Sequence, residues 1–231
     1  CIENQLTSLD VSGATALTTL DCNYNQLTSL DVSQNTALTT LDCENNLTSL
    51  DVSQNTALTY LFCSRNQLTS LDVSGATALT TLYCDRNQLS SLDVSQNTAL
   101  TTLGCSFNQL SSLDVSGATA LTSLYCGGNG LTSLDVSANL ALTKLDCENN
   151  NLTSLDVRNG NNTNFIFFKC KNNPSLYCIN VDDLTWSTSN WTVIDSQHYF
   201  STNCPPLSAI QEHTTNKELL KVTDLLGRET K

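Results

Sequence analysis

The sequence predicts a mostly β solenoid of about eight coils, and three observations predict it. A unit of the form L-x-x-L-x-C-x-x-N-x-L-[ST]-S-L-D-V-S-x-x-T-A recurs every 21 residues from Leu17 to Leu142, except that the copy at Leu38 is one residue shorter. Apolar and polar residues alternate within each copy, which is typical of short strands with one buried face. One copy cannot bury its apolar residues alone, so neighbouring copies must stack.

Each copy is expected to contain two short extended segments. In the copy at Leu17, Leu20 and Cys22 alternate with polar residues, and Leu30 and Val32 do so again further on. We therefore predict a flattened coil with a parallel ladder on each broad face and with Leu, Val and Cys between the faces. Stacked strands lie ~4.8 Å apart, so eight coils form a rod roughly 40 Å long.

One asparagine recurs in every copy, and we call these residues the Asn column. They are Asn4, Asn25, Asn46, Asn66, Asn87, Asn108, Asn129, Asn150 and Asn173. Each lies where the strand leaves the sheet and backbone groups lose their ladder partners. An inward amide can donate to and accept from those groups and the next coil, because buried polar groups need partners. We predict a structural role for this column.

One cysteine also recurs in every copy at an inward position, and we call these residues the Cys column. They are Cys1, Cys22, Cys43, Cys63, Cys84, Cys105, Cys126, Cys147 and Cys170. A free cysteine behaves as a small apolar residue. One thiol per coil forms a line rather than the closed tetrahedron of a metal site. We expect buried free thiols, with disulfides between adjacent coils or a metal site as alternatives.

The repeated pattern resembles the 21-residue bacterial leucine-rich repeats, and more narrowly the cysteine-ladder type found in internalin-like surface proteins. The resemblance covers residues 1 to about 178. It implies a secreted or surface-attached binding scaffold without enzymatic activity, and it names no ligand.

An aspartate in every copy is expected to face outward on the second face, and we call these residues the Asp column. They are Asp10, Asp31, Asp51, Asp72, Asp93, Asp114, Asp135 and Asp156, and they contribute to a net charge of −12. We expect a solvated face with hydrogen bonds from flanking Ser and Thr. A calcium-binding row is the alternative, although calcium needs six to eight oxygens per ion. The negative charge argues against nucleic acid and anionic membranes as partners.

The outward positions of the first face vary, and their large residues gather in the middle coils. We call this set the patch: Tyr60, Phe62, Arg65, Tyr83, Arg86, Phe107 and Tyr125. Exposed aromatic residues with Arg are enriched at interface hot spots. Gly104, between Tyr83 and Tyr125, is expected to leave a notch between two rings. The patch predicts a ligand-binding surface; the alternative is that cross-strand aromatic pairs only stabilise the sheet.

The repeats are expected to span residues 1–164, and a degenerate last repeat with an aromatic cap residues 165–204. Phe165 and Phe168 replace Leu there, as closing the last coil requires, and a short helix is expected to start near Asp182 and Asp183. Two cysteines outside the Cys column, Cys178 and Cys204, bracket the cap. In an exported protein such cysteines form a disulfide.

Residues 205–231 are expected to form a linker and the truncated start of another domain. Its segment ELLKVTDLLGRETK resembles the opening of the C-terminal sorting domain used by type IX secretion in Bacteroidetes. That resemblance implies export to the outside of the outer membrane. No apolar run approaches the ~20 residues of a membrane span.

The sequence predicts a recognition protein rather than an enzyme, with no cofactor. Its two histidines, His198 and His213, lie after the repeats, and the chain lacks a catalytic triad pattern, a phosphate loop and a zinc motif. We expect the patch to bind a protein on another cell, as an adhesion module would; carbohydrate is the alternative ligand. A purely structural or ice-ordering polar surface is a third possibility.

Overall fold

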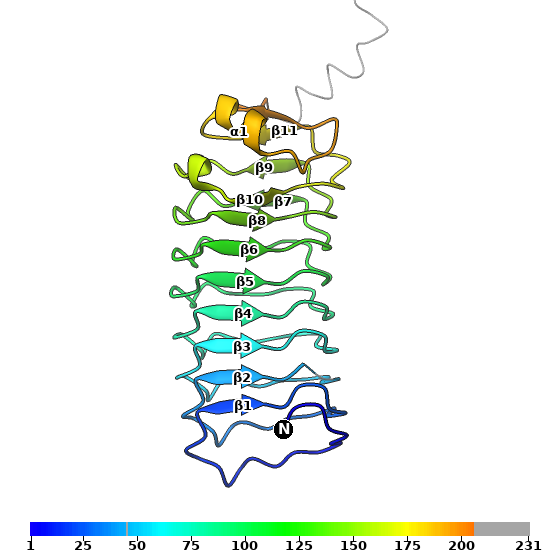
Figure 1. The fold of residues 1–231 in the computed structure, drawn as a ribbon, viewed down its shortest axis with the longest axis vertical. Coiled ribbons are helices and arrows are strands. Elements are labelled where there is room, and N and C mark those ends of the chain that lie inside the picture. The colour runs from blue at the N-terminus through cyan, green and yellow to red at the C-terminus, as the bar shows by residue number, and fades with distance from the viewer. Residues whose placement is uncertain (45, 206–231) are drawn as a thin grey trace, which may run out of the picture.

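The computed structural model describes residues 1–44 and 46–205. The chain is a rod of stacked coils, with the N-terminal coil at one end and helix α1 at the other (Figure 1). This is the predicted solenoid, and it has about nine turns. The expected linker and sorting-domain resemblance fall outside the described residues, apart from Pro205.

The first face is a parallel sheet with one strand from each of eight successive coils, starting after the N-terminal coil. Its eight strands are β1 (Thr19–Asp21), β2 (Thr40–Asp42), β3 (Tyr60–Phe62), β4 (Thr81–Tyr83), β5 (Thr102–Gly104), β6 (Ser123–Tyr125), β8 (Lys144–Asp146) and β10 (Phe167–Lys169). They pair in strict register, so that Phe62 lies beside Tyr83 and Leu61 beside Leu82. Equivalent positions of successive coils therefore form rows along the rod, as the repeat predicts.

The second face is a regular ladder only toward the C-terminal end of the part of the chain that the structure describes. Its four strands are β7 (Ser133–Asp135), β9 (Ser154–Asp156), β11 (Cys178–Asn180) and β12 (Tyr199–Ser201), in the order β12-β11-β9-β7. In the earlier coils from Leu30 onward the equivalent Leu and Val are still buried, but their segments are not strands. Burial of alternate side chains therefore holds these segments in place without a complete backbone ladder.

Leu, Val and Cys fill the space between the two faces. The thiols of the Cys column are free, and all are buried except that of Cys1. Burial raises the pKa of Cys84 and Cys105 well above the usual value, because the thiolate would lose its hydration. The expectation of buried free thiols is confirmed.

The Asn column supplies the hydrogen bonds that the strand ends lack. Asn87 Nδ2 donates to the carbonyl oxygens of Cys63 and Cys84, both at 3.0 Å. Its Oδ1 accepts from the Leu68 amide at 3.0 Å. The predicted structural role is confirmed at Asn25 and from Asn66 to Asn173, with the inter-coil bonds running to the preceding coil, whereas Asn4 and Asn46 are exposed.

The C-terminal end of the rod is closed by aromatic side chains. Trp191 is buried, and its ring stacks on Phe168 with centroids 4.1 Å apart. Phe165, Trp186 and Phe200 surround the same ring at 5.2 to 5.8 Å. These contacts cover core residues that have no further coil above them.

Two short helical segments belong to this end. A 3₁₀ turn, η1, spans Asn162–Asn164, and helix α1 spans Leu184–Asn190. Asp183 caps α1 by accepting a hydrogen bond from the Trp186 amide at 2.9 Å, which stabilises the first turn. The expected helix near Asp182 and Asp183 is thus present.

A disulfide joins Cys178 to Cys204. Cys178 begins β11, and Cys204 follows β12 near the end of the described chain. The bond therefore fastens the last described residues to the sheet of the second face.

Candidate functional site

In the part of the chain that the structure describes, a left-handed backbone conformation recurs just before the residues of the Asn column. The φ angles of Tyr24, Arg65, Arg86 and Phe107 lie between 53° and 57°. Gly128 and Asn149 occupy the same position two and three coils beyond Arg86. Glycine and asparagine adopt this conformation readily, whereas bulkier side chains cost about 1 kcal/mol there.

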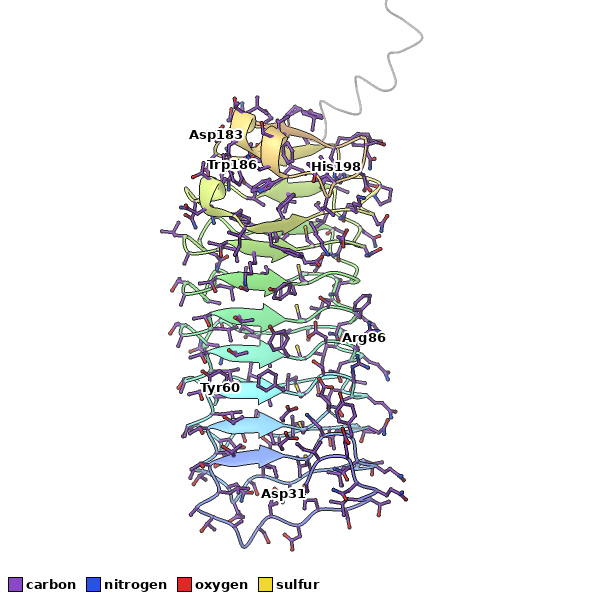
Figure 2. The ribbon with its side chains drawn as sticks, viewed as in Figure 1. Asp31, Tyr60, Arg86, Asp183, Trp186 and His198 are labelled. Carbon is purple, nitrogen blue, oxygen red and sulfur yellow. A yellow bond between two sulfur atoms is a disulfide. The ribbon has the colours of Figure 1, made fainter. Side chains whose placement is uncertain are left out.

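The left-handed residues remain part of the hydrogen-bonded ladder. The Arg65 amide donates to the Asp85 carbonyl, and the Arg86 amide donates to the Ser106 carbonyl, each at 2.8 Å. Their backbone is therefore fixed by neighbouring coils, and the side chains extend outward from the turn beside the strand ends. Figure 2 shows Arg86 at that edge of the rod, whereas Tyr60 lies over the sheet.

The patch contains one parallel aromatic pair. The rings of Phe62 and Tyr83 lie 5.7 Å apart with an interplanar angle of 9°. A Cβ atom added to Gly104 would be only 2.4 Å from the Tyr83 ring. The notch expected at Gly104 is therefore wrong: Tyr83 leans across the rung and occupies that space.

A second pair joins a cation to a ring. The Arg86 guanidinium carbon lies 4.5 Å from the centroid of the Phe107 ring. A Cβ atom on Gly128 would be 2.7 Å from that ring, so Phe107 also leans over a glycine of the next coil. Phe107 remains 50% exposed.

Residues of the patch surround a shallow, open depression of about 400 Å³. It is lined by Glu44, Phe62, Ser64, Arg65, Tyr83, Asp85 and Arg86. Arg65 Nε is 3.9 Å from Glu44 Oε2, and the Arg65 side chain is 66% exposed. Such an exposed, long ion pair contributes little to stability.

The two carboxyl groups of the depression lie in different surroundings. Asp85 accepts from the Ser106 amide at 2.8 Å and from the Ser64 hydroxyl at 3.4 Å. Burial nevertheless raises its pKa above the usual range. Burial and the neighbouring Asp42 likewise raise the pKa of Glu44, although Arg65 lowers it in part. Both acids are thus held in places where their charge is poorly solvated.

The remaining two patch residues lie apart from the depression. Tyr125 contacts Phe167 edge-on at 6.3 Å. Tyr60 is 45% exposed, and no ring contact involves it in the described part of the chain. The structure therefore brings five of the seven predicted residues together and leaves Tyr60 and Tyr125 at the margins.

Sequence reasoning omitted three residues that belong to this surface. Glu44 and Ser64 line the depression, and Phe167 extends the aromatic row beyond Tyr125. Phe167 lies in the same outward column as Tyr60, so its position in the repeat would have identified it. Glu44 and Ser64 directly follow residues of the Cys column, at a position that no patch residue occupies, so the variable outward positions did not point to them.

The Asp column forms a different surface. Its residues through Asp135 are exposed, and each accepts the amide of the residue two positions later, as Ser95 donates to Asp93 at 2.8 Å. That amide and the Ser95 hydroxyl lower the pKa of the Asp93 carboxyl. Within residues 1–44 and 46–205, no three His, Cys, Asp or Glu side chains are grouped as metal ligands.

The stacked coils, the Asn column and the buried cysteines define a leucine-rich-repeat solenoid with a cysteine ladder. Among solved structures, the chain is similar to the functional domain of InlJ from Listeria monocytogenes, which includes a cysteine ladder. The two share 43% sequence identity with a TM-score of 0.72, over 86% of this chain and 46% of that one. No protein-family model and no curated protein matches the sequence.

More distant structures share the fold. A leucine-rich-repeat protein of Leptospira interrogans is 22% identical, with a TM-score of 0.63, over 96% of this chain and 52% of that one. The ectodomain of the Arabidopsis thaliana receptor kinase GASSHO1/SCHENGEN3, solved in complex with CASPARIAN STRIP INTEGRITY FACTOR 2, is 21% identical with a TM-score of 0.65. The alignment covers 82% of this chain and 25% of the receptor chain. The chain thus spans about half the length of the first two relatives.

None of the helices in the described part of the chain is both long enough and apolar enough to cross a bilayer.

Proposed function

We propose that this protein is a non-enzymatic recognition module that binds a protein ligand through the patch on its first face. The residues in contact with the ligand would be Tyr60, Phe62, Arg65, Tyr83, Arg86, Phe107 and Tyr125, with the depression between Arg65 and Arg86 at the centre. The likeness to InlJ and to a receptor ectodomain solved in complex with a protein factor supports a binding role.

The observation that carries this proposal is the choice of residues at the left-handed position. Asn or Gly is present there in the coils of Gly128, Asn149 and Asn172, yet the middle coils have Arg65, Arg86 and Phe107. Each of these bulky residues raises the free energy of the folded state by about 1 kcal/mol. Glu3 and Tyr24 have the same conformation outside the patch. The middle coils differ because Arg65, Arg86 and Phe107 follow one another on adjacent coils beside one depression, which contact with a partner would explain.

The ring contacts favour protein over carbohydrate, the other candidate ligand. Sugars bind aromatic residues by lying across an open ring face. Tyr83 is flanked by Phe62 and by the backbone at Gly104, and Phe107 by Arg86 and Gly128. The rings are only partly open, with Phe107 50% exposed and Tyr83 half-buried, which suits the irregular surface of a protein.

The test compares two asparagine substitutions at equivalent left-handed positions. Phe107→Asn removes a ring from the patch, and Tyr24→Asn removes an exposed ring from the same column outside it. The probes are a displayed library of extracellular protein domains and a glycan array. We expect domains that bind the wild type and Tyr24→Asn but lose about tenfold or more in affinity for Phe107→Asn.

Both variants should be at least as stable as the wild type, because asparagine adopts this backbone conformation more readily than Phe or Tyr. Binding that survives both Phe107→Asn and the double change Tyr83→Ala with Tyr125→Ala would exclude the patch. Patch-dependent binding to glycans alone would replace the protein ligand with a carbohydrate.

We also propose that the protein is secreted or displayed on the cell surface. The Cys178–Cys204 disulfide supports this, because disulfides persist in oxidising compartments. Cell fractionation followed by mass spectrometry of the non-reduced protein tests it. A cytosolic protein with both thiols free would contradict the proposal.

A further inference from the structure

Basic residues are almost absent from the repeats. Arg65 and Arg86 are the only Lys or Arg before Lys144 in a chain with a net charge of −12. They occupy equivalent positions on adjacent coils, at the side of one depression. Both are in the left-handed conformation, with φ of 57° and 56°.

The two arginines differ in how their charge is balanced. Arg65 has the distant Glu44 carboxylate at 3.9 Å. Arg86 has no carboxylate within 4.0 Å in the described part of the chain, although Asp85 precedes it directly. Asp85 is instead bonded to Ser106 and Ser64, so its charge is directed toward the neighbouring coils.

The Phe107 ring holds the Arg86 guanidinium in place. The guanidinium carbon lies over the ring, 4.5 Å from its centroid, and a cation–π contact of this kind leaves N–H groups of the guanidinium available to a ligand. A guanidinium already held by such a contact loses less side-chain entropy when it binds. This arrangement suits a planar carboxylate that accepts two parallel hydrogen bonds.

We infer that the protein partner presents an Asp or Glu side chain that binds Arg86 in the depression between the two arginines. This inference rests on the proposed function and specifies the chemistry of its ligand. A singly charged carboxylate fits better than a phosphate or sulfate, because Glu44 and Asp85 line the same depression and would repel a higher charge more strongly.

The test uses a displayed library of random linear peptides selected on the wild-type protein. Selected peptides are synthesised in two forms, with the acidic residue intact and with it changed to its amide. Each form is measured against wild type, Arg86→Gln, Arg86→Lys, Phe107→Asn and Tyr24→Asn, at low and at high salt.

We expect selected peptides to be enriched in Asp or Glu. Arg86→Gln should weaken the acidic peptide about tenfold or more, and Arg86→Lys should restore the affinity only in part, because Lys lacks the planar fork. The amide peptide should bind wild type and Arg86→Gln equally weakly. Tyr24→Asn should bind as the wild type does.

The outcomes separate this inference from the proposed function. Peptides that require Phe107 but show neither acidic enrichment nor dependence on Arg86 would overturn the inference and leave the proposed function standing. Both the inference and the proposed function would be overturned by two results together. No selected peptide would depend on Phe107 or Arg86, and no domain in the library of extracellular domains would bind. Arg86-dependent binding confined to acidic glycans would overturn the assignment of the carboxylate to a protein.

Discussion

Each buried amide of the Asn column satisfies three backbone groups that the strand end leaves open. Asn87 bonds two carbonyls and one amide at 3.0 Å each. A second asparagine position, in the turn after the second segment of each coil, forms fewer hydrogen bonds. Asn97 donates to the carbonyls of Val73 and Ala76, but its Oδ1 has no partner. Replacing the two asparagines would therefore leave different numbers of backbone groups without a hydrogen-bond partner.

Asn87→Ala should lower the free energy of unfolding by about 3 kcal/mol, because several buried backbone groups lose their partners. Asn97→Ala should cost about 1 kcal/mol, since alanine already occupies the equivalent position at Ala76 and Ala118. Urea denaturation of both variants measures the difference. Equal losses would show that the number of hydrogen bonds does not decide the role of the Asn column.

The sequence predicts that equivalent residues of successive coils form rows along the rod, because copies with identical spacing place equivalent residues at the same point of each coil. It did not reach the left-handed conformation of Arg65, Arg86 and Phe107, because these residue types normally avoid it. Nor did it find the direction of the Tyr83 ring, which depends on the space that Gly104 leaves in the next coil. Such contacts between coils are not encoded in the pattern of any single repeat.

At the scale of elements, the C-terminal cap is held by a carboxylate as well as by aromatic rings. Asp195 accepts from the amides of Asn172 and Asn173 at 2.9 and 2.8 Å. His198 Nδ1 accepts from the Asp195 amide, and its Nε2 lies 3.3 Å from the Asn173 carbonyl. This network links the segment before β12 to the last residue of the Asn column.

The Asp195 network predicts a dependence of stability on pH. Burial opposes the charge of Asp195, but the two amides and His198 outweigh it and lower its pKa. A carboxyl whose pKa is lower when folded stabilises the protein above its unfolded pKa, about 4, and loses this effect as pH falls through the folded pKa. Asp195→Asn should therefore be less stable than wild type at pH 7, and the difference should shrink as the pH falls below about 4.

Denaturation measured across this pH range, with Asp183→Asn as the control for an exposed acid of the same cap, checks this. A difference between wild type and Asp195→Asn that stays constant with pH would mean that charge plays no part in holding the cap.

At the scale of the whole molecule, each coil contacts only its neighbours, so the stability should be close to a sum over coils and interfaces. Removing residues 17–37 deletes one complete repeat and leaves the patch intact. We expect a shorter solenoid that still unfolds cooperatively, with a lower midpoint because one interface is lost. Circular dichroism during thermal unfolding measures this, and retained peptide binding checks the patch.

Removal of the cap, residues 165–231, is the comparison for that deletion. It uncovers the core of the preceding coil and should cause aggregation rather than a moderate loss of stability. If the variant without residues 17–37 fails to fold while the variant without the cap stays soluble, the additive description of the coils is wrong.

The turn glycines have a consequence for how such a chain can change in evolution. A Cβ atom on Gly75 would lie 2.6 Å from the Ser53 carbonyl, and one on Gly117 would lie 2.7 Å from that of Ser95. Each glycine coil follows a coil with Gln at the same position, Gln54 or Gln96. Near-identical DNA repeats recombine easily, yet shuffled copies that brought a larger side chain into this contact would fit poorly. At Gly75 and Gly117 the order of the repeats is thus a constraint of its own, although the coil of Gln54 follows that of Gln34, so the constraint is local to these two contacts.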